Sequence, residues 1–402
     1  MFAQRNILYA VLYIFLICIK ISAQPAGNYS IRSGKHSITI PFKLDLNHLV
    51  LQVKDSNQNE LDLILDTGMP GYGILLFEGP KTKNIEFQNS SEIMVGGPGG
   101  EPSPAKMASG LSLTLGEIEF NNLTAIIMPF DSSRSLNLKE DGVIGLEIFS
   151  RFVVDIDNEN NKLTLTEPDY FNYFGQGSEI PLDIVRNMPY LFCNAEMESG
   201  EIVQTKLVID IGASHALSLN LSTQKEIVLP AKTLEVRTGR SVSAEIYGKV
   251  GRIKNLQLGS YSIDYPIVSF HERAMHPAEK EGNLGSGILH RFNTIFDYKN
   301  KRMILEPNKF FNDPFDYDMT GMQTSKTKTG FYKIDKILPS SPASENNLRV
   351  GDVIIELNGQ TASEITPDEM RKMFVKNGEA INLRIMRADK ELSFSIKLRP
   401  LI

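Results

Sequence analysis

The sequence predicts a mainly β protein with two related lobes, formed by an internal duplication, followed by a small C-terminal α+β domain. Three observations support this fold class. Short runs of alternating apolar residues, separated by turn signals, recur along most of the chain, which is typical of strands and hairpins. One half of this region repeats the other. After Pro307 the pattern changes and helix start signals appear.

Length and composition fit a globular protein with more than one domain. The chain has 402 residues, of which 42% are hydrophobic and 22% charged, and this length is enough for two or three domains. The formal charge is −6 and no cluster of basic residues is visible. A nucleic-acid partner is therefore not expected, because such a partner requires a basic surface.

The first 23 residues have the features of a signal peptide. Arg5 precedes an apolar run at residues 7–19, and Ala23 supplies a small residue at a plausible cleavage point. The run is short for a membrane span, which needs about 20 apolar residues. We therefore expect export to the periplasm or the medium without a stable membrane span. An uncleaved anchor is the less favoured alternative.

The internal repeat defines the domain organisation. Residues 141–165 align without a gap on residues 281–305, and residues 61–76 match residues 205–219. The expected domains are therefore a signal peptide at residues 1–23, two lobes at residues 24–175 and 176–308, and a small domain at residues 309–402.

Each repeat contains an apolar strand followed by an aspartate, one further residue and a glycine. These residues are Asp66, Thr67 and Gly68 in the first copy, and Asp210, Ile211 and Gly212 in the second. Glycine allows a sharp turn and the close approach of another backbone. Two such turns from related lobes can bring the two carboxylates face to face, where they share one proton. One then acts as a general base on water while the other polarises a carbonyl, so no cofactor or metal is required.

These motifs, with a later apolar-apolar-Gly motif at residues 143–145 and its copy at residues 283–285, resemble those of retropepsin- and pepsin-type aspartic peptidases. The resemblance spans about 270 residues. It implies a bilobal β-barrel fold of the acid-protease type with a peptide-binding cleft, and Asp66 and Asp210 as the catalytic pair. It also implies flap-like hairpins near residues 93–107 and 237–248.

The same resemblance assigns loop-supporting roles to Thr67, Gly68, Gly212 and Ser214, whose hydroxyl would hydrogen-bond the outer oxygen of Asp210. The family usually has Thr or Ser directly after each aspartate, and Ile211 departs from that pattern. We expect Ile211 to make the surroundings of Asp210 less polar and to favour its protonated form.

Two further departures are Pro70, where a hydroxyl residue is usual, and Asn283, which replaces one apolar residue of the second apolar-apolar-Gly motif.

The C-terminal segment resembles a PDZ domain of the bacterial protease-associated kind. The resemblance rests on residues 341–343, 348, 350–354 and 357–359. It implies a groove that takes an extended peptide C-terminus as an added strand. Thr320, Gly321 and Met322 are the best match to the loop whose amides would hold the peptide carboxylate.

Other chemistries have little support. His271 and His276 are five residues apart, whereas two zinc ligands on one helical face need a spacing of four. Removal of the signal peptide leaves Cys193 without a disulfide partner, in an apolar stretch that predicts a core residue. The favoured function is an exported aspartic endopeptidase. The alternatives are a pseudopeptidase that binds peptides without cutting them and, less favoured, a peptidase that needs a homodimer.

Overall fold

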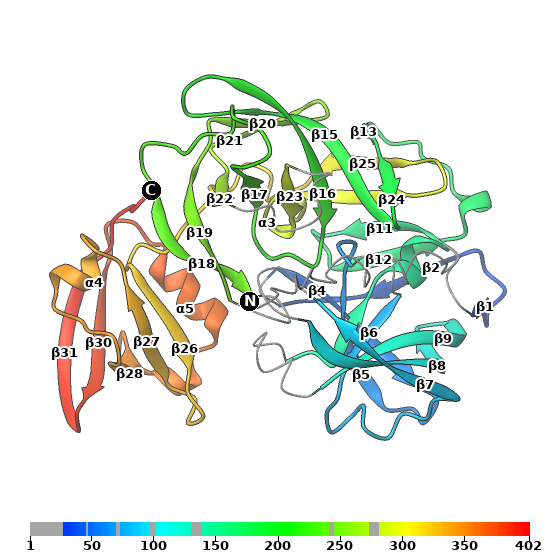
Figure 1. Cartoon of the computed structure of the whole chain (residues 1–402), viewed down its shortest axis with the longest axis horizontal. Helices are drawn as coiled ribbons and strands as arrows, with labels where there is room; N and C mark the ends of the chain where they lie inside the picture. Colours follow the sequence, from blue (N-terminus) through cyan, green and yellow to red (C-terminus); the bar gives the residue numbers. More distant parts are fainter. Residues whose placement is uncertain are drawn as a thin grey trace, which may run out of the picture.

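The computed structural model describes residues 27–45, 47–69, 73–96, 102–129, 139–240, 245–272 and 281–402. The predicted signal peptide lies outside these ranges, as do residues 97–101 and 241–244 within the two predicted flaps. The described part is mainly β, with two lobes and a C-terminal domain that carries most of its helical residues, which confirms the predicted fold class (Figure 1).

Each lobe is built around one large mixed sheet. The sheet of the first lobe contains, in spatial order, β1 (Asn28–Ile31), β9 (Ile118–Met128), β6 (Ile74–Phe77), β10 (Gly142–Ile144), β5 (Glu60–Leu65), β4 (His48–Asp55), β8 (Ser103–Leu115) and β7 (Asn89–Val95), with β3 (Lys43–Asp45) on β4. The sheet of the second lobe contains β18 (Leu234–Arg240), β19 (Glu245–Arg252), β22 (Ile267–His271), β17 (Leu217–Asn220), β23 (Gly282–Gly285), β16 (Ile202–Asp210), β15 (Met188–Glu196), β20 (Asn255–Leu258) and β21 (Tyr261–Asp264), with β14 (Asp183–Val185) on β15.

The strand registers of the two lobes repeat each other. In the first lobe β10 runs parallel to β5, with Gly142 opposite Leu63. In the second lobe β23 runs parallel to β16, with the equivalent pair Gly282 and Leu207 in register. A Cβ on either glycine would lie within 2.2 Å of a backbone carbonyl oxygen of the neighbouring strand. The repeated glycines are therefore required by the close approach of the strands, and the predicted duplication is confirmed.

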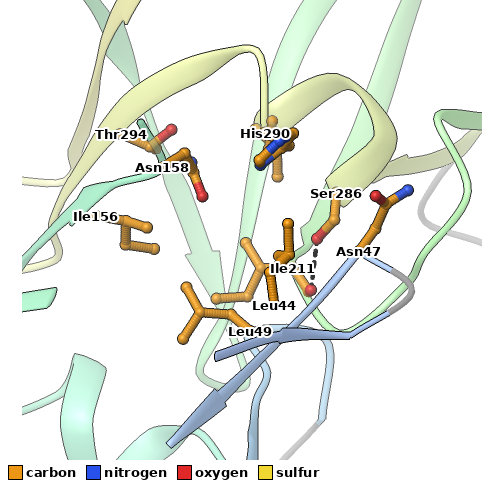
Figure 2. Close-up of a pocket in the computed structure, with 10 residues that line it drawn as sticks. Leu44, Asn47, Leu49, Ile156, Asn158, Ile211, Ser286, His290 and Thr294 are labelled. Carbon is orange, nitrogen blue, oxygen red and sulfur yellow. Dashed lines mark hydrogen bonds between the residues drawn. The ribbon is translucent and has the colours of Figure 1, made fainter. Parts of the chain in front are cut away.

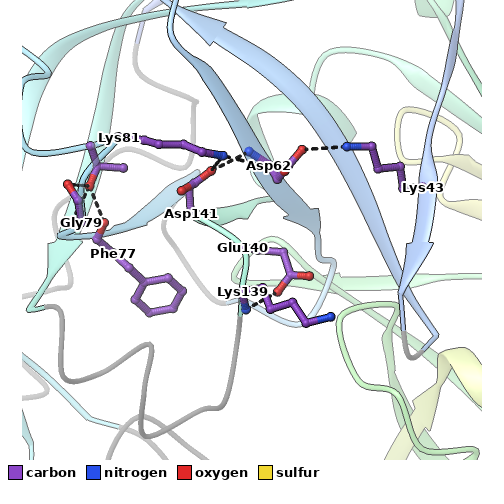
Figure 3. Close-up of polar contacts among 9 residues, drawn as sticks. Lys43, Asp62, Phe77, Gly79, Lys81, Lys139, Glu140 and Asp141 are labelled. Carbon is purple, nitrogen blue, oxygen red and sulfur yellow. Dashed lines mark hydrogen bonds and ion pairs between the residues drawn. The ribbon is translucent and has the colours of Figure 1, made fainter. Parts of the chain in front are cut away.

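An acidic side chain just before each of these glycines repeats as well. Asp141 Oδ2 accepts the backbone N–H of Asp62 at 2.9 Å, and the equivalent Glu281 Oε2 accepts the N–H of Lys206 at 2.6 Å. In the first lobe Lys81 pairs with Asp141 at 2.8 Å (Figure 3). Asp141 precedes β10 and Glu281 precedes β23. Each side chain therefore hydrogen-bonds the backbone of the adjacent strand, β5 or β16, shortly before that strand reaches its aspartate.

A third sheet joins the lobes. Its order is β13 (Ser178–Pro181), β25 (Arg302–Pro307), β24 (Phe292–Asp297), β11 (Val153–Asp157), β12 (Lys162–Thr166) and β2 (Ser37–Pro41). β11 and β24 are antiparallel, and Asp155 lies opposite its own repeat equivalent, Ile295. The pseudo-two-fold axis that relates the lobes therefore passes between these two residues. The apolar core continues across the axis, where Phe149 packs edge-on against Phe296 with ring centroids 5.2 Å apart.

Short helices and 3-10 turns lie in the two lobes and in the C-terminal domain. The helices and 3-10 turns are α2 (Leu146–Phe149), α3 (Ser286–Leu289), α4 (Pro342–Glu345), α5 (Pro367–Phe374), η2 (Pro168–Tyr170) and η3 (Ala362–Glu364). At the start of α5 the Thr366 and Glu369 side chains form a reciprocal capping box, with Pro367 in the first turn. These are helix start signals of the kind expected after Pro307.

The C-terminal domain is a small sheet covered by α5 and has a separate apolar core. Its strand order is β26 (Met322–Lys326), β27 (Tyr332–Ile337), β28 (Val353–Leu357), β30 (Ala380–Arg387) and β31 (Lys390–Lys397), with β29 (Gln360–Thr361) on β28. Within the residues described, β26 is an edge strand paired with β27 alone.

This domain packs on the hairpin β18–β19 of the second lobe (Figure 1). Val236 and Val250 of the hairpin form an apolar cluster with Leu338, and the last two residues of the chain, Leu401 and Ile402, pack against it. Lys336 donates to the Glu235 carbonyl at 2.9 Å. The domain is therefore attached to the hairpin that the sequence predicts to be the flap of the second lobe.

Cys193 is buried in the core, as predicted, and burial raises the pKa of its thiol to about 11. None of the helices in the described ranges has the length and apolar character needed to cross a membrane.

Candidate active site and peptide groove

The two predicted aspartates occupy equivalent positions at the ends of the inner strands. Asp66 follows β5 directly and its N–H donates to the Ile144 carbonyl at 2.9 Å, whereas Asp210 is the last residue of β16 and lies opposite Gly285. A Cβ on Gly145 would lie 2.1 Å from the Asp66 carbonyl oxygen. The glycines of both apolar-apolar-Gly motifs thus admit the backbone of the aspartate turns.

The two aspartate loops meet across the pseudo-two-fold axis. A Cβ on Gly68 would lie 2.6 and 2.7 Å from the two carboxyl oxygens of Asp210, and a Cβ on Gly212 would lie 2.6 Å from Asp66 Oδ1. Each glycine therefore receives the carboxyl group of the opposite lobe in the space that a side chain would fill. The sequence predicted this close approach, and the geometry brings all four residues together.

The environment of Asp66 disfavours its charge. Burial, followed by the negative charge of Asp210, raises the pKa of Asp66 well above its usual range, and the hydrogen bond between the two carboxyl groups raises it further. The N–H groups of Gly68 and Gly212 oppose this shift, and Gly68 donates to Asp66 Oδ1 at 2.6 Å. The two carboxyl groups therefore hold one proton as a pair. The expectation that Ile211 favours the protonated form of Asp210 stays a prediction.

Thr67 links the two loops with its buried hydroxyl. Thr67 Oγ1 donates to the Ile209 carbonyl oxygen at 2.7 Å and accepts the N–H of Ile211 at 3.1 Å. These bonds cross from the first lobe to the second. Ile211, the equivalent of Thr67 in the second lobe, has no hydroxyl with which to form the same two hydrogen bonds back to the first lobe. Thr67 therefore contributes hydrogen bonds to the contact between the loops, whereas Ile211 contributes apolar packing.

Ile211 instead behaves as a core residue. It is 4% exposed and lines a narrow cavity together with Leu44, Leu49 and Ile156 (Figure 2). Its carbonyl oxygen accepts the Ser286 hydroxyl at 2.6 Å. The isoleucine loop is therefore held by apolar contacts and by one hydrogen bond from α3.

The side-chain amide of Asn283 contacts the carboxyl group of Asp210. Its Nδ2 donates to Asp210 Oδ2 at 2.7 Å. Ser214, to which the sequence assigned this role, is exposed, and its carbonyl accepts Asn47 Nδ2 at 3.1 Å. In the sequence Asn283 is a departure from the apolar-apolar-Gly motif, and this amide in place of an apolar residue was the signal for the contact.

The two predicted flaps are hairpins in their described parts. β7 and β8 pair down to Val95 opposite Ser103, and β18 pairs with β19 along their lengths. Ile93 and Val95 pack against the same apolar cluster as Met69, which follows Gly68. The first hairpin therefore stands next to the loop that carries Asp66.

The predicted carboxylate loop of the C-terminal domain makes internal hydrogen bonds. Asp318 Oδ1 accepts the N–H of Thr320 at 2.8 Å, the N–H of Gly321 at 3.0 Å and the Thr320 hydroxyl at 2.6 Å. The N–H of Met322 donates to Thr320 Oγ1 at 3.0 Å. The sequence analysis did not single out Asp318, although an aspartate two residues before a turn is a common acceptor for the turn amides.

Metal ligation finds no support in the part of the chain that is described, where no group of three or more His, Cys, Asp or Glu side chains is placed to hold an ion. His276 lies outside that part.

Asp66→Asn is expected to change the pH dependence of stability. A raised folded-state pKa stabilises the fold below the unfolded-state value, about 3.9 for Asp, and this contribution is lost as the pH rises through the folded-state value. The free energy of unfolding of the wild type should therefore fall, relative to that of Asp66→Asn, between about pH 4 and neutrality. Denaturant titrations at several pH values measure it. Asp389→Asn, at an exposed turn, is the control, and a pH-independent difference for Asp66→Asn would contradict the assignment.

Ile211→Thr is expected to raise the peptidase activity that the sequence resemblance predicts, or to shift its pH profile, because a hydroxyl at this position can complete the mirror-image hydrogen bonds beside the Asp210 loop. The measurement is a pH–rate profile of the variant beside the wild type, with Thr67→Val as the converse variant that removes the existing bonds. If Ile211→Thr and the wild type have identical profiles, the missing hydroxyl does not limit activity.

Comparison with known proteins finds a similarity for the C-terminal domain. A family model described as PDZ domain matches residues 320–398, and no curated protein matches the chain. The match covers the sheet β26 to β31, helix α5 and the loop that precedes β26. The C-terminal domain is therefore a PDZ domain, a module that binds peptides.

Proposed function

We propose that the protein is an exported aspartic endopeptidase that hydrolyses peptide bonds with a water molecule activated by Asp66 and Asp210. The observation that carries the proposal is the reciprocal contact in which Gly68 receives the carboxyl group of Asp210 and Gly212 receives that of Asp66. Carboxyl groups held this close share one proton, the arrangement that water-activating acid pairs use. The predicted signal peptide supports export.

The unequal environments of the two carboxyl groups assign their roles. We infer that Asp66 holds the shared proton, because burial and the charge of Asp210 disfavour its anion. Asp210 accepts the Asn283 amide, and a donor of this kind stabilises an anionic acceptor. We therefore assign the general base to Asp210 and the general acid to Asp66, with Asn283 as a positioning residue.

The reaction then proceeds without a covalent intermediate. Asp210 takes a proton from water as the water oxygen bonds to the peptide carbonyl carbon, and Asp66 gives its proton to the carbonyl oxygen. These steps give a tetrahedral species with two hydroxyl groups. When it collapses, Asp210 gives its proton to the leaving nitrogen, the C–N bond breaks, and one hydroxyl group returns a proton to Asp66. The pair ends with the single proton with which it began.

The PDZ domain supplies peptide binding next to the second lobe. It packs on the hairpin β18–β19 of the second lobe through Leu338 and Lys336. Such a position suits a module that holds an unfolded polypeptide while the cleft acts on it. The partners of the chain are therefore peptide or protein substrates.

Asp66→Asn and Asp210→Asn are each expected to abolish cleavage of an unfolded protein, because one carboxyl group cannot act as both acid and base in the same step. The measurement is the appearance of new N-termini from the purified mature chain between acidic and neutral pH. Asp389→Asn is the matched surface control. Undiminished cleavage by either variant overturns the proposal. Complete absence of cleavage by the wild type favours a peptide-binding pseudopeptidase. The feature that supports this alternative is Ile211, which lacks the hydroxyl that is usual at its position.

Asn283→Val, which restores the residue type of Val143 in the first lobe, is expected to lower kcat about 10- to 100-fold, because a hydrogen bond to a charged group contributes about 1.5–3 kcal/mol. The acid limb of the pH–rate profile should move to higher pH, since the base loses a donor that stabilises its anion. Steady-state kinetics across pH measure both effects. A purely structural role for Asn283 would lower the amount of folded enzyme and leave the profile of the folded fraction in place.

A further inference from the structure

The loop before β26 already holds a carboxylate. The N–H groups of Thr320 and Gly321 donate to Asp318, and that of Met322 donates to the Thr320 hydroxyl. These are the amides that the PDZ resemblance assigns to the carboxylate of a bound peptide C-terminus. All of them are engaged within the loop, and the two that bind Asp318 already hold a group with the chemistry of the ligand that they were expected to receive.

Asp318 is poorly placed to give way to a peptide carboxylate. Burial raises the pKa of Asp318 to about 6, although the hydrogen bonds from Thr320 and Gly321 act in the opposite direction and lower it. Its carboxyl group is thus predominantly ionised at neutral pH. An incoming terminal carboxylate would face a like charge in a partly buried place and would have to displace donors from an existing anion.

The loop is also anchored on both sides. Gly321 has a φ of +75°, and a Cβ there would lie 2.2 Å from the Ser341 Cβ. The Thr320 carbonyl accepts the Ala343 N–H at 3.0 Å, the Gly321 carbonyl accepts the Leu338 N–H at 2.8 Å, and Met319 donates to the Phe374 carbonyl at the end of α5. Turning the amides outward would break these contacts with three neighbouring segments.

The free edge of β26 still offers a peptide site. Within the described residues β26 pairs with β27 alone, so the backbone groups on its other edge are available to an added strand. Gln323, Thr324 and Ser325 are partly exposed along this strand. The groove therefore retains the means to bind an extended backbone but lacks free donors for a terminal carboxylate.

We propose that this PDZ domain binds an internal extended segment of an unfolded polypeptide, added as a strand to β26, and that Asp318 excludes free C-termini. The ligand is a stretch of chain without a terminal carboxylate at the Thr320–Met322 loop. This inference concerns binding alone and stands whether or not Asp66 and Asp210 cleave peptides.

The surroundings of the loop fit a ligand that continues past it. Gln323, next to the loop, donates to the Arg237 carbonyl of β18 at 3.4 Å, so the end of the groove that carries the loop adjoins the hairpin of the second lobe. A segment that does not terminate at Asp318 extends toward this hairpin. A bound C-terminus would stop at the loop.

The test uses the full mature chain carrying Asp66→Asn, so that bound peptides stay intact. Two degenerate libraries of about twelve residues, acetylated at the N-terminus and identical except for a C-terminal amide or a free carboxylate, are passed over the immobilised chain. The amide library is expected to be retained at least as well as the carboxylate library. Adding Asp318→Ala should increase retention of the carboxylate library about tenfold or more, as expected for donors that gain a charged acceptor, and should change retention of the amide library little.

Asp316→Ala, which removes an exposed carboxylate two residues away, is the matched control and should leave both libraries unchanged. Asp318→Asn keeps the acceptor geometry and removes the charge. It should also increase the ratio of carboxylate-library retention to amide-library retention, and it covers the case in which Asp318→Ala does not fold. The proposal is overturned if the parent chain retains the carboxylate library and amidation abolishes retention, if neither library is retained, or if both Asp318 variants leave the ratio unchanged.

Discussion

The arrangement of the two lobes depends on the reciprocal contact between the glycine of each aspartate loop and the carboxyl group of the other lobe. Gly68 and Gly212 have no side chain, and the space is filled by Asp210 and Asp66. The contact brings two carboxyl groups into a poorly hydrated place, where a shared proton limits the electrostatic cost. The interlobe pairing of β11 with β24 and the Thr67 hydroxyl hold the loops in this position.

The duplication creates two similar loops, and single substitutions make them unequal. In the second lobe Ile211 replaces a hydroxyl with an apolar contact, and Asn283 donates to Asp210. In the first lobe Val143, the equivalent of Asn283, packs against the same apolar cluster as Ile93 and Val95 of the hairpin β7–β8. A homodimer of identical lobes would impose the same surroundings on both aspartates. A fused pair allows one carboxyl group to hold the proton and the other to accept one.

Much of the fold was predictable because the repeat is visible in the sequence. The glycines at 142, 145, 282 and 285 recur at matched places, and in the structure each lies where a Cβ would meet backbone. The hydrogen bond from Asn283 to Asp210 was not predictable, because the two residues are 73 positions apart and their contact depends on the register of β16 with β23. The packing of the PDZ domain on β18–β19 has no local signal either, since its contacts join residues about a hundred positions apart. The internal hydrogen bonds of Asp318 had a local signal that sequence reasoning overlooked.

The most direct test of the proposed acid pair is a ¹³C-NMR titration of the aspartate carboxyl carbons in the wild type and in Asp210→Asn. The account predicts that Asp66 titrates well above the ordinary aspartate value of about 3.9 in the wild type, and that its titration moves toward lower pH when the charge of Asp210 is removed. Titration of Asp66 near the ordinary value in the wild type, with no response to Asp210→Asn, would contradict the account.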